Sequence, residues 1–296
     1  MPEGDSVFRA ARRLSRLDGH EVLRSDFRVP QHATADLTGA TVLGTASRGK
    51  HLLTRFSTGV TLHTHLRMDG EWSVLTPGKR LPRRLEPDIR ILLLTDGPSA
   101  AALRMPVVEL LPTADEADAV GHLGPDLLDL VTPVDDLVAE AVRRLGRRPD
   151  RTVKAALLDQ RNLAGIGNLW ADELCYLRGL SPWVPVGEVR TEPLVRLAIK
   201  ALRFSVSPAG APQVTTGDTR PGRQHWVSGR AGQPCRRCGT TVEVIPEVPG
   251  DPERRRTWWC PSCQPGPAAP PPPEPSAGGR TRTPPPAADP GPRVGS

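Results

Sequence analysis

Two C-x-x-C pairs near the carboxyl end constrain the fold of this chain more than any other feature. Four thiolates suit a tetrahedral Zn²⁺, and each pair can supply two of the four corners. The segment between the pairs has the pattern strand, turn, strand, and a module this small has too little core to fold without the ion. We therefore predict a zinc ribbon over residues 227–264 with one structural Zn²⁺, whose four ligands leave no position open for substrate: Cys235, Cys238, Cys260 and Cys263.

The cysteine usage also bears on the compartment. Four of the five cysteines stand in these pairs, which metal binding in a reducing compartment explains better than disulfides do. No stretch approaches the roughly 20 apolar residues of a transmembrane helix, and the start of the chain lacks an apolar signal core. We expect a cytoplasmic protein without a membrane partner.

The charge is basic and unevenly distributed. Lysine and arginine total 39 against 33 acidic residues, for a net charge of +6. The arginines recur in clusters, which is typical of proteins that bind a polyanion. A genome rich in G and C would also enrich arginine, so composition alone leaves both explanations open.

The hydrophobic pattern changes along the chain. Residues 5–17 show helical spacing, with Val7, Ala11, Leu14 and Leu17 on one face. Short apolar runs typical of strands follow, which predicts a sandwich or barrel: 21–29, 40–45, 51–56, 60–68, 89–95 and 101–110. Helical patterns then cover 134–145, 153–160, 168–177 and 193–206. We predict four units: 1–121 (β-rich), 122–226 (helical), 227–264 (zinc ribbon) and 265–296 (a disordered proline-rich tail).

The first residues carry a possible chemistry. If Met1 is removed, Pro2 exposes a secondary amine, and α-amino groups have pKa values of roughly 7.7–8.0, so part of the amine is an unprotonated nucleophile at neutral pH. Attack on a sugar carbon that bears a damaged base would give a cationic iminium able to accept electrons. Glu3 beside it could transfer protons. A proline at position 2 is by itself common and indicates nothing.

Several motifs occur together and in order: MPEGD (1–5), SRGKHLL (47–53), HLRMDG (65–70), HLGPDLL (122–128), QRNLAGIGN (160–168), VSGRAGQPCRRCGT (227–240) and RRRTWWCPSCQ (254–264). This combination resembles the Fpg/Nei family of bifunctional DNA glycosylases. The resemblance covers residues 1–264, and the MPEGD start is similar to the endonuclease VIII (Nei) branch. It implies an α+β multidomain fold: an N-terminal β-sandwich with flanking helices, a helix-two-turn-helix domain and a C-terminal zinc ribbon.

The resemblance also implies roles for single residues. Pro2 matches the Schiff-base nucleophile, Glu3 the adjacent proton-transfer carboxylate and Lys50 a catalytic lysine at the lesion phosphate. Asn168 and Arg255 match residues that grip DNA phosphates, although Arg254 or Arg256 could replace Arg255. Met68 lies in the region that fills the gap left by an extruded nucleotide, or is an ordinary methionine at a hairpin end.

The implied function is a DNA glycosylase and AP lyase of base excision repair. It would act as a monomer on damaged DNA, excise oxidised bases, expected to be pyrimidines, and cut the strand by β,δ-elimination through the Pro2 iminium. A non-catalytic damaged-DNA-binding protein on the same scaffold is the alternative, and a zinc-ribbon interaction or RNA-binding module is a more distant one. We expect His63 and His65 to line a polar sheet face rather than bind metal, and Cys175 to be buried and inert.

Overall fold

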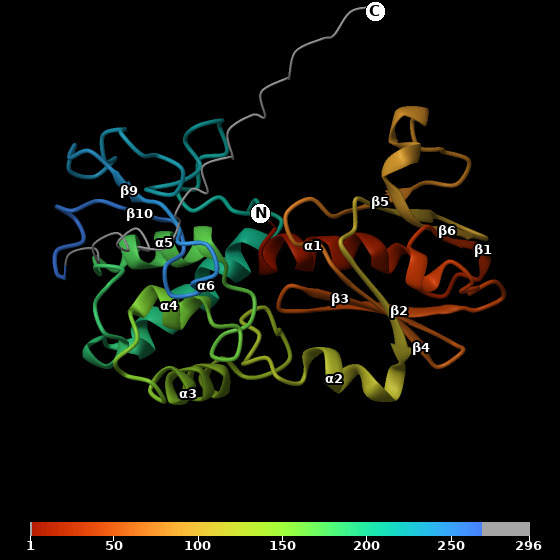
Figure 1. Cartoon of the computed structure of the whole chain (residues 1–296), viewed down its shortest axis with the longest axis horizontal. Coiled ribbons are helices and arrows are strands. Elements are labelled where there is room, and N and C mark those ends of the chain that lie inside the picture. Colours follow the sequence, from red (N-terminus) through yellow and green to blue (C-terminus); the bar gives the residue numbers. More distant parts are fainter. Residues whose placement is uncertain (1, 268–296) are drawn as a thin grey trace, which may run out of the picture.

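The computed structural model describes residues 2–267, and Met1 and residues 268–296, which hold most of the predicted disordered tail, lie outside the described part. Figure 1 shows two lobes side by side. The strands of the N-terminal half form one lobe, and the helices and the small cysteine-bearing ribbon form the other. The predicted α+β class, with a β-sandwich, a helical domain and a ribbon, is confirmed.

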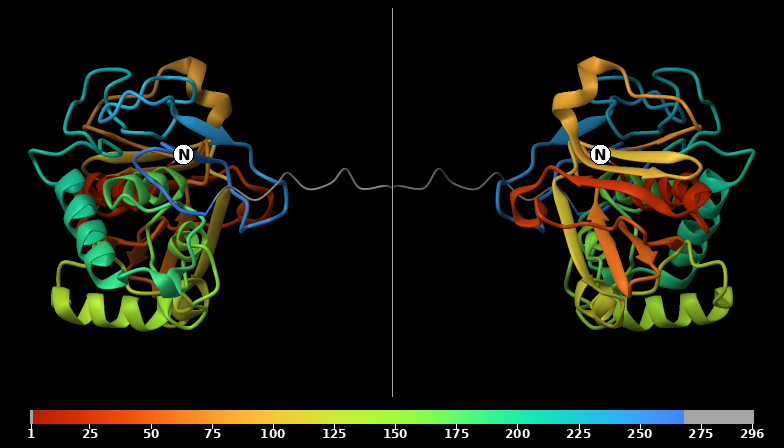
Figure 2. Two further views of the ribbon diagram at one scale, coloured as in Figure 1. Left: turned by 90° about the vertical axis from the view of Figure 1, so that its left-hand side faces the viewer. Right: turned by 90° about the vertical axis from the view of Figure 1, so that its right-hand side faces the viewer.

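The first lobe contains two four-stranded antiparallel sheets, with strand orders β1-β6-β7-β5 and β2-β3-β4-β8. In the right-hand view of Figure 2 the strands of the two sheets run in clearly different directions. The inner faces share one apolar core. The strands are β1 (Val22–Phe27), β2 (Val42–Arg48), β3 (His51–Phe56), β4 (Val60–His65), β5 (Glu71–Leu75), β6 (Ile89–Thr95), β7 (Ser99–Leu103) and β8 (Val107–Pro112).

Three strand predictions need correction. The run 101–110 is not one strand but parts of β7 and β8, because Arg104 takes a positive φ of 45° and Pro106, without an N–H, follows in the turn. β4 ends at His65 rather than at residue 68. β5 was not predicted, since only Trp72 in it is buried and its apolar alternation is therefore weak.

Helix α1 (Gly4–Leu14) joins the two lobes. Its predicted apolar face is confirmed: Val7, Ala11, Leu14 and Leu17 are all buried in the sandwich core. The α-helix ends at Leu14, and Leu17 lies in a 3₁₀ turn over 15–17 rather than in the helix. Arg9 of the same helix contacts the second lobe, because its guanidinium donates to the carbonyls of Ser205 (2.7 Å) and Gly210 (2.7 Å).

The second lobe packs its helices around a separate apolar core. Its helices are α3 (Val134–Leu145), α4 (Val153–Leu158), α5 (Asn168–Leu177) and α6 (Thr191–Val206), and the short α2 (Glu116–Val120) leads into it. The ribbon strands β9 (Glu243–Ile245) and β10 (Thr257–Trp259) pair antiparallel above α5 (Figure 1). Within residues 2–267, no helix is long and apolar enough to cross a membrane.

Backbone contacts at the joint fix the amino terminus against the second lobe. The Gly4 N–H donates to the carbonyl of Gly165 at 2.9 Å. A Cβ on Gly4 would lie 2.8 Å from the Gly165 Cα, so no larger residue fits there without a shift. The tight approach of these two glycines holds the first residues of the chain at the start of α5.

Candidate active site

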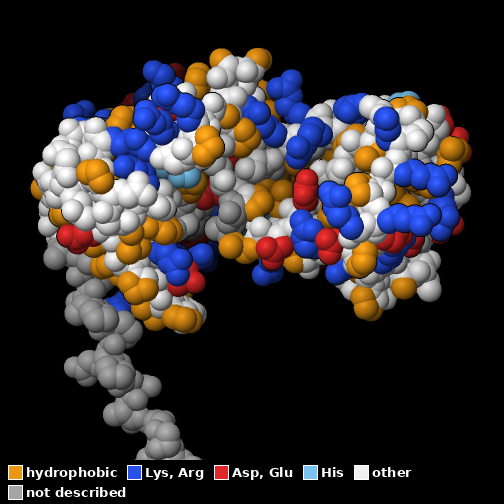
Figure 3. Space-filling model, turned by 90° about the horizontal axis from the view of Figure 1, so that it is seen from above, with side chains coloured by type: hydrophobic (Ala, Val, Ile, Leu, Met, Phe, Trp, Pro, Cys, Tyr) orange, Lys and Arg blue, Asp and Glu red, His pale blue; other side chains and the backbone are white. Residues whose placement is uncertain are grey.

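A cleft of about 1040 Å³ lies where the lobes meet. It receives side chains from the amino terminus, the β2–β3 turn, the β4–β5 turn and the start of α5. The ribbon hairpin, the segment between β9 and β10, also contributes side chains. In the view of Figure 3, Lys and Arg side chains are spread over both lobes, which are joined by a narrower waist. Five residues predicted from the sequence line this cleft: Pro2, Lys50, Met68, Asn168 and Arg255.

Glu3 lies beside the cleft with its carboxylate at the start of α5. The carboxylate accepts hydrogen bonds from the backbone N–H groups of Gly167 (2.8 Å), Leu169 (2.8 Å) and Trp170 (3.3 Å). Only 1% of Glu3 is exposed. Burial raises the pKa of Glu3, while the charge of Lys50 and the backbone donors act in the opposite direction. Glu3 is therefore a buried carboxyl group whose protonated form is favoured more than in water.

Asn168 is the first residue of α5 and does not cap it. The N-cap position is Gly167, and the acceptor for the free amides is the carboxylate of Glu3, distant in sequence. A Cβ on Gly167 would lie 2.3 Å from the Glu3 Cδ. The glycine of the sequence motif is therefore needed to admit the carboxylate, and the helix start holds an anion as its dipole favours.

Lys50 lies in the tight turn between β2 and β3. The turn is fixed from the other lobe, because the Gly49 N–H donates to the Asp126 carboxylate at 2.6 Å. Burial lowers the pKa of Lys50; Glu3 opposes this shift and the positive charge of Arg255 adds to it. A lysine with a lowered pKa can hold or release a proton closer to neutral pH than a surface lysine can.

Asn168 and the ribbon hairpin are tied together. The Asn168 Nδ2 donates to the Arg256 carbonyl at 2.8 Å, and the buried Lys154 Nζ donates to the same carbonyl at 2.6 Å. Lys154 also pairs with Asp172 at 2.6 Å. These contacts fix the backbone beside Arg255, and no sequence motif indicated the Lys154–Asp172 pair.

The three consecutive arginines of the hairpin point to different surroundings. Arg255 lines the cleft with Lys50. Arg254 lies 3.7 Å from an Asp251 carboxylate oxygen, and Arg256 lies over the ring of Trp258, outside this cleft. The arrangement favours Arg255 over its neighbours as the residue that faces a ligand.

Met68 lies at the β4–β5 turn with 63% of its surface exposed, on the rim of the cleft. The neighbouring Arg67 also lines the cleft and has a positive φ of 45°. An exposed methionine at a cleft rim carries apolar surface without a protein partner. The position is compatible with the predicted gap-filling role, which stays a prediction.

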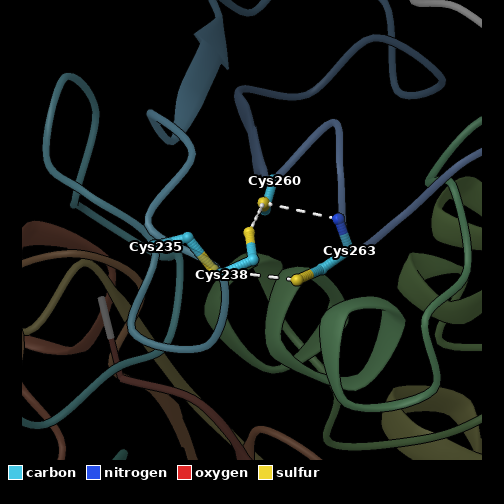
Figure 4. Close-up of side chains that lie close together, drawn as sticks. All are labelled: Cys235, Cys238, Cys260 and Cys263. Atoms are coloured by element: carbon cyan, nitrogen blue, oxygen red, sulfur yellow. Dashed lines mark hydrogen bonds between the residues drawn. The ribbon is translucent and has the colours of Figure 1, made fainter.

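The four paired cysteines come together in the ribbon, and Figure 4 shows their side chains converging. Their sulfur atoms all lie within 4.8 Å of one another. The distances are 3.9 Å from Cys235 to Cys263 and 3.5 Å from Cys238 to Cys260. Tetrahedral Zn²⁺ with Zn–S bonds of about 2.3 Å needs sulfurs about 3.8 Å apart, so this donor set fits a zinc ion.

Cys175 is separate from this cluster. It lies in the core of the helical lobe with no exposed surface, and burial raises the pKa of its thiol to about 12. A thiol with so high a pKa forms almost no thiolate near neutral pH. The prediction that it is buried is confirmed.

Sequence reasoning missed part of the cleft wall. His51 and Glu109 line the cleft with His63 and His65. The predicted polar sheet face around the two latter histidines is thus part of the candidate site itself. Only the pairing of β3, β4 and β8 brings these residues together, and no spacing within one segment indicates it.

Two protein-family models match successive parts of the chain. The formamidopyrimidine-DNA glycosylase N-terminal domain model matches residues 1–104, and the formamidopyrimidine-DNA glycosylase H2TH domain model matches residues 123–205. In structure, the chain is similar to Lactococcus lactis Fpg in complex with DNA containing N7-benzyl-Fapy-dG. The TM-score is 0.70 at 22% identity, over 90% of this chain and 100% of that one. At 22% identity, this structural similarity establishes the fold of the chain alone.

Curated relatives are much closer in sequence. A probable endonuclease 8 2 of Streptomyces coelicolor is 50% identical over 273 residues, which cover 90% of this chain and 95% of that protein. The DNA-(apurinic or apyrimidinic site) lyase Nei2 of Mycolicibacterium smegmatis is 42% identical, over 89% of this chain and 99% of that protein. The chain therefore belongs to the Fpg/Nei family of DNA glycosylases, in its endonuclease VIII branch.

Proposed function

We propose that this chain is a bifunctional DNA glycosylase and AP lyase of base excision repair. One observation carries the proposal: Pro2 and Lys50 line a single cleft, with Glu3 beside them. The family resemblance implies that Pro2 and Glu3 act at the reacting sugar and Lys50 at the lesion phosphate, and Lys50 is distant in sequence from the other two. A protein that only binds damaged DNA would have no need for this combination.

The chemistry starts at the Pro2 nitrogen once Met1 has been removed. The secondary amine attacks the sugar carbon C1′, the damaged base leaves with the electron pair of its bond to C1′, and the nitrogen loses its proton. The C1′–O4′ bond then breaks, its electron pair goes to O4′, which takes up a proton, and the nitrogen lone pair forms the cationic iminium with C1′. Glu3, with its raised pKa, supplies and takes back protons at the opening sugar. Lys50 holds the lesion phosphate and assists the departure of the phosphate groups.

DNA binding is proposed to use the phosphate clamps on both sides of the cleft. Extruding a nucleotide costs a few kcal/mol, less for a damaged base. Lys50, Asn168 and Arg255 would offset this cost, and Met68 would fill the gap. We further propose one structural Zn²⁺ on the four cysteines, and action as a monomer in the cytoplasm.

The salt dependence of binding tests the clamp. Arg255→Ala should reduce the slope of log affinity against log salt by about 1, because one phosphate contact is lost. Fluorescence anisotropy with a labelled abasic duplex at several salt concentrations measures this slope. Arg254→Ala is the matched control and should leave the slope unchanged. If Arg254→Ala instead carries the loss, the assignment of the clamp to Arg255 is wrong.

The substrate class is tested with oligonucleotides that carry single lesions. Duplexes with thymine glycol, dihydrouracil or an abasic site should be cut efficiently, and a duplex with 8-oxoguanine should be cut poorly. Strand cutting under single turnover is the readout. Binding to all four duplexes without any cutting would instead support the non-catalytic alternative.

A further inference from the structure

A row of hydrogen-bonded side chains runs along the cleft wall across three neighbouring strands. The Nδ1 of His51 on β3 lies 2.8 Å from the Nε2 of His63 on β4. The Nδ1 of His63 lies 2.7 Å from a carboxylate oxygen of Glu109 on β8. All three residues line the same cleft as Pro2 and Lys50.

The register of the sheet explains how this row forms. His63 is directly opposite Glu109, and His51 is opposite His65, two residues further along β4. Alternate residues point to opposite faces of a strand, so Leu52, Leu62 and Val108 enter the sandwich core while the row faces the cleft. The row is therefore a feature of one sheet face and not of a loop.

When both histidines are neutral, the hydrogen bonds determine which ring nitrogen of each histidine carries the proton. The Glu109 carboxylate only accepts, so His63 must donate from Nδ1 and its Nε2 carries a lone pair. His51 must then donate from Nδ1, which leaves the lone pair of the ring on its own Nε2. This is the logic by which a carboxylate orients a histidine base.

Burial differs along the row. His63 is 4% exposed, whereas 56% of the Glu109 side chain is exposed. Burial lowers the pKa of His51 to about 3. The basic groups that face it act in the same direction: His65, His63, His122 and Lys50. His51 is thus neutral near neutral pH. The row begins beside Lys50 at His51 and ends in solvent at Glu109.

We propose that His51, His63 and Glu109 form a proton relay that removes the proton released in the elimination step. This inference rests on the proposed lyase function. In that step the C2′–H bond of the iminium-linked sugar breaks and its electron pair flows toward the iminium nitrogen. The resulting enamine expels the 3′ phosphate with the electron pair of its C–O bond. The proton joins His51 Nε2, the Nδ1 proton of His51 passes to His63, and the Nδ1 proton of His63 passes to Glu109 and then to water.

Glu109→Gln tests the relay at its exposed end. The amide oxygen can still accept from His63, so the geometry is kept, but it cannot take up a proton. On an abasic duplex under single turnover, borohydride trapping should stay within two-fold of wild type. Strand cutting should slow by about 10-fold or more, and added imidazole buffer should restore it. His63→Phe, which keeps a ring in the buried position, should slow cutting similarly.

Asp96→Asn is the matched control, since His20 and Asp96 form a pair of 2.8 Å outside the cleft. It should cut at the wild-type rate. Wild-type cutting by Glu109→Gln, or a slower rate that does not depend on buffer concentration, overturns the relay. Absence of a trapped complex from the wild-type protein overturns the lyase chemistry itself, so the two failures are distinguishable.

Discussion

Adding Gly-Ser ahead of Pro2 should lower strand cutting at an abasic site by roughly 10³-fold or more. The extension converts the ring nitrogen into an amide, whose electron pair is delocalised and cannot attack a sugar carbon. The phosphate-binding side chains are unchanged, so the variant should still bind the duplex. Single-turnover cutting and borohydride trapping on an abasic duplex measure the loss.

Two controls separate chemistry from crowding at the amino terminus. The same Gly-Ser pair added after Ser296 should have no effect. Pro2→Ala restores a primary α-amine after removal of Met1, so it should cut more slowly than wild type but faster than the extended form. An extended form that cuts within two-fold of wild type would show that the Pro2 nitrogen is not the nucleophile.

Cys260→Ser should weaken binding to an abasic duplex by roughly 100-fold. The substitution removes one of the four ligands, and modules of this size fold with their metal. β10 begins at Thr257, directly after the arginine run, so loss of the ion frees Arg255 from its place in the cleft. Anisotropy with a labelled duplex gives the affinity, and elemental analysis gives the zinc content.

Cys175→Ala is the matched control, because this cysteine lies in the helical core and outside the cluster. It should keep one zinc ion per chain and wild-type affinity. Chelation of the wild-type protein should reproduce the effect of Cys260→Ser. A metal-free protein with wild-type affinity would contradict the structural role assigned to the ion.

Much of the fold could be predicted because it follows from local patterns of residues in the sequence. The apolar spacing over residues 5–17 identified four residues that are buried, and the two cysteine pairs form one cluster. Gly49 takes a positive φ of 58° in the turn between β2 and β3, a conformation that glycine adopts without strain. Where one segment determines its own conformation, residue spacing is sufficient.

The features that could not be predicted from the sequence depend on contacts between distant segments. The cap of α5 comes from Glu3, so no property of the helix sequence could identify it. Arg9 binds the carbonyl of Ser205 in the last turn of α6 and that of Gly210 beyond its end, and no spacing within α1 indicates these partners. The row from His51 to Glu109 exists only through strand pairing. The chemistry-bearing residues could be named from their motifs, but their partners required the structure.

The most direct measurement locates the covalent bond itself. Wild-type protein is trapped on an abasic duplex with borohydride, digested with protease and nuclease, and analysed by tandem mass spectrometry. The proposed mechanism predicts a sugar remnant on the nitrogen of Pro2, in a peptide that lacks Met1. A remnant on the Lys50 side chain instead, or on a peptide without Pro2, would contradict the account.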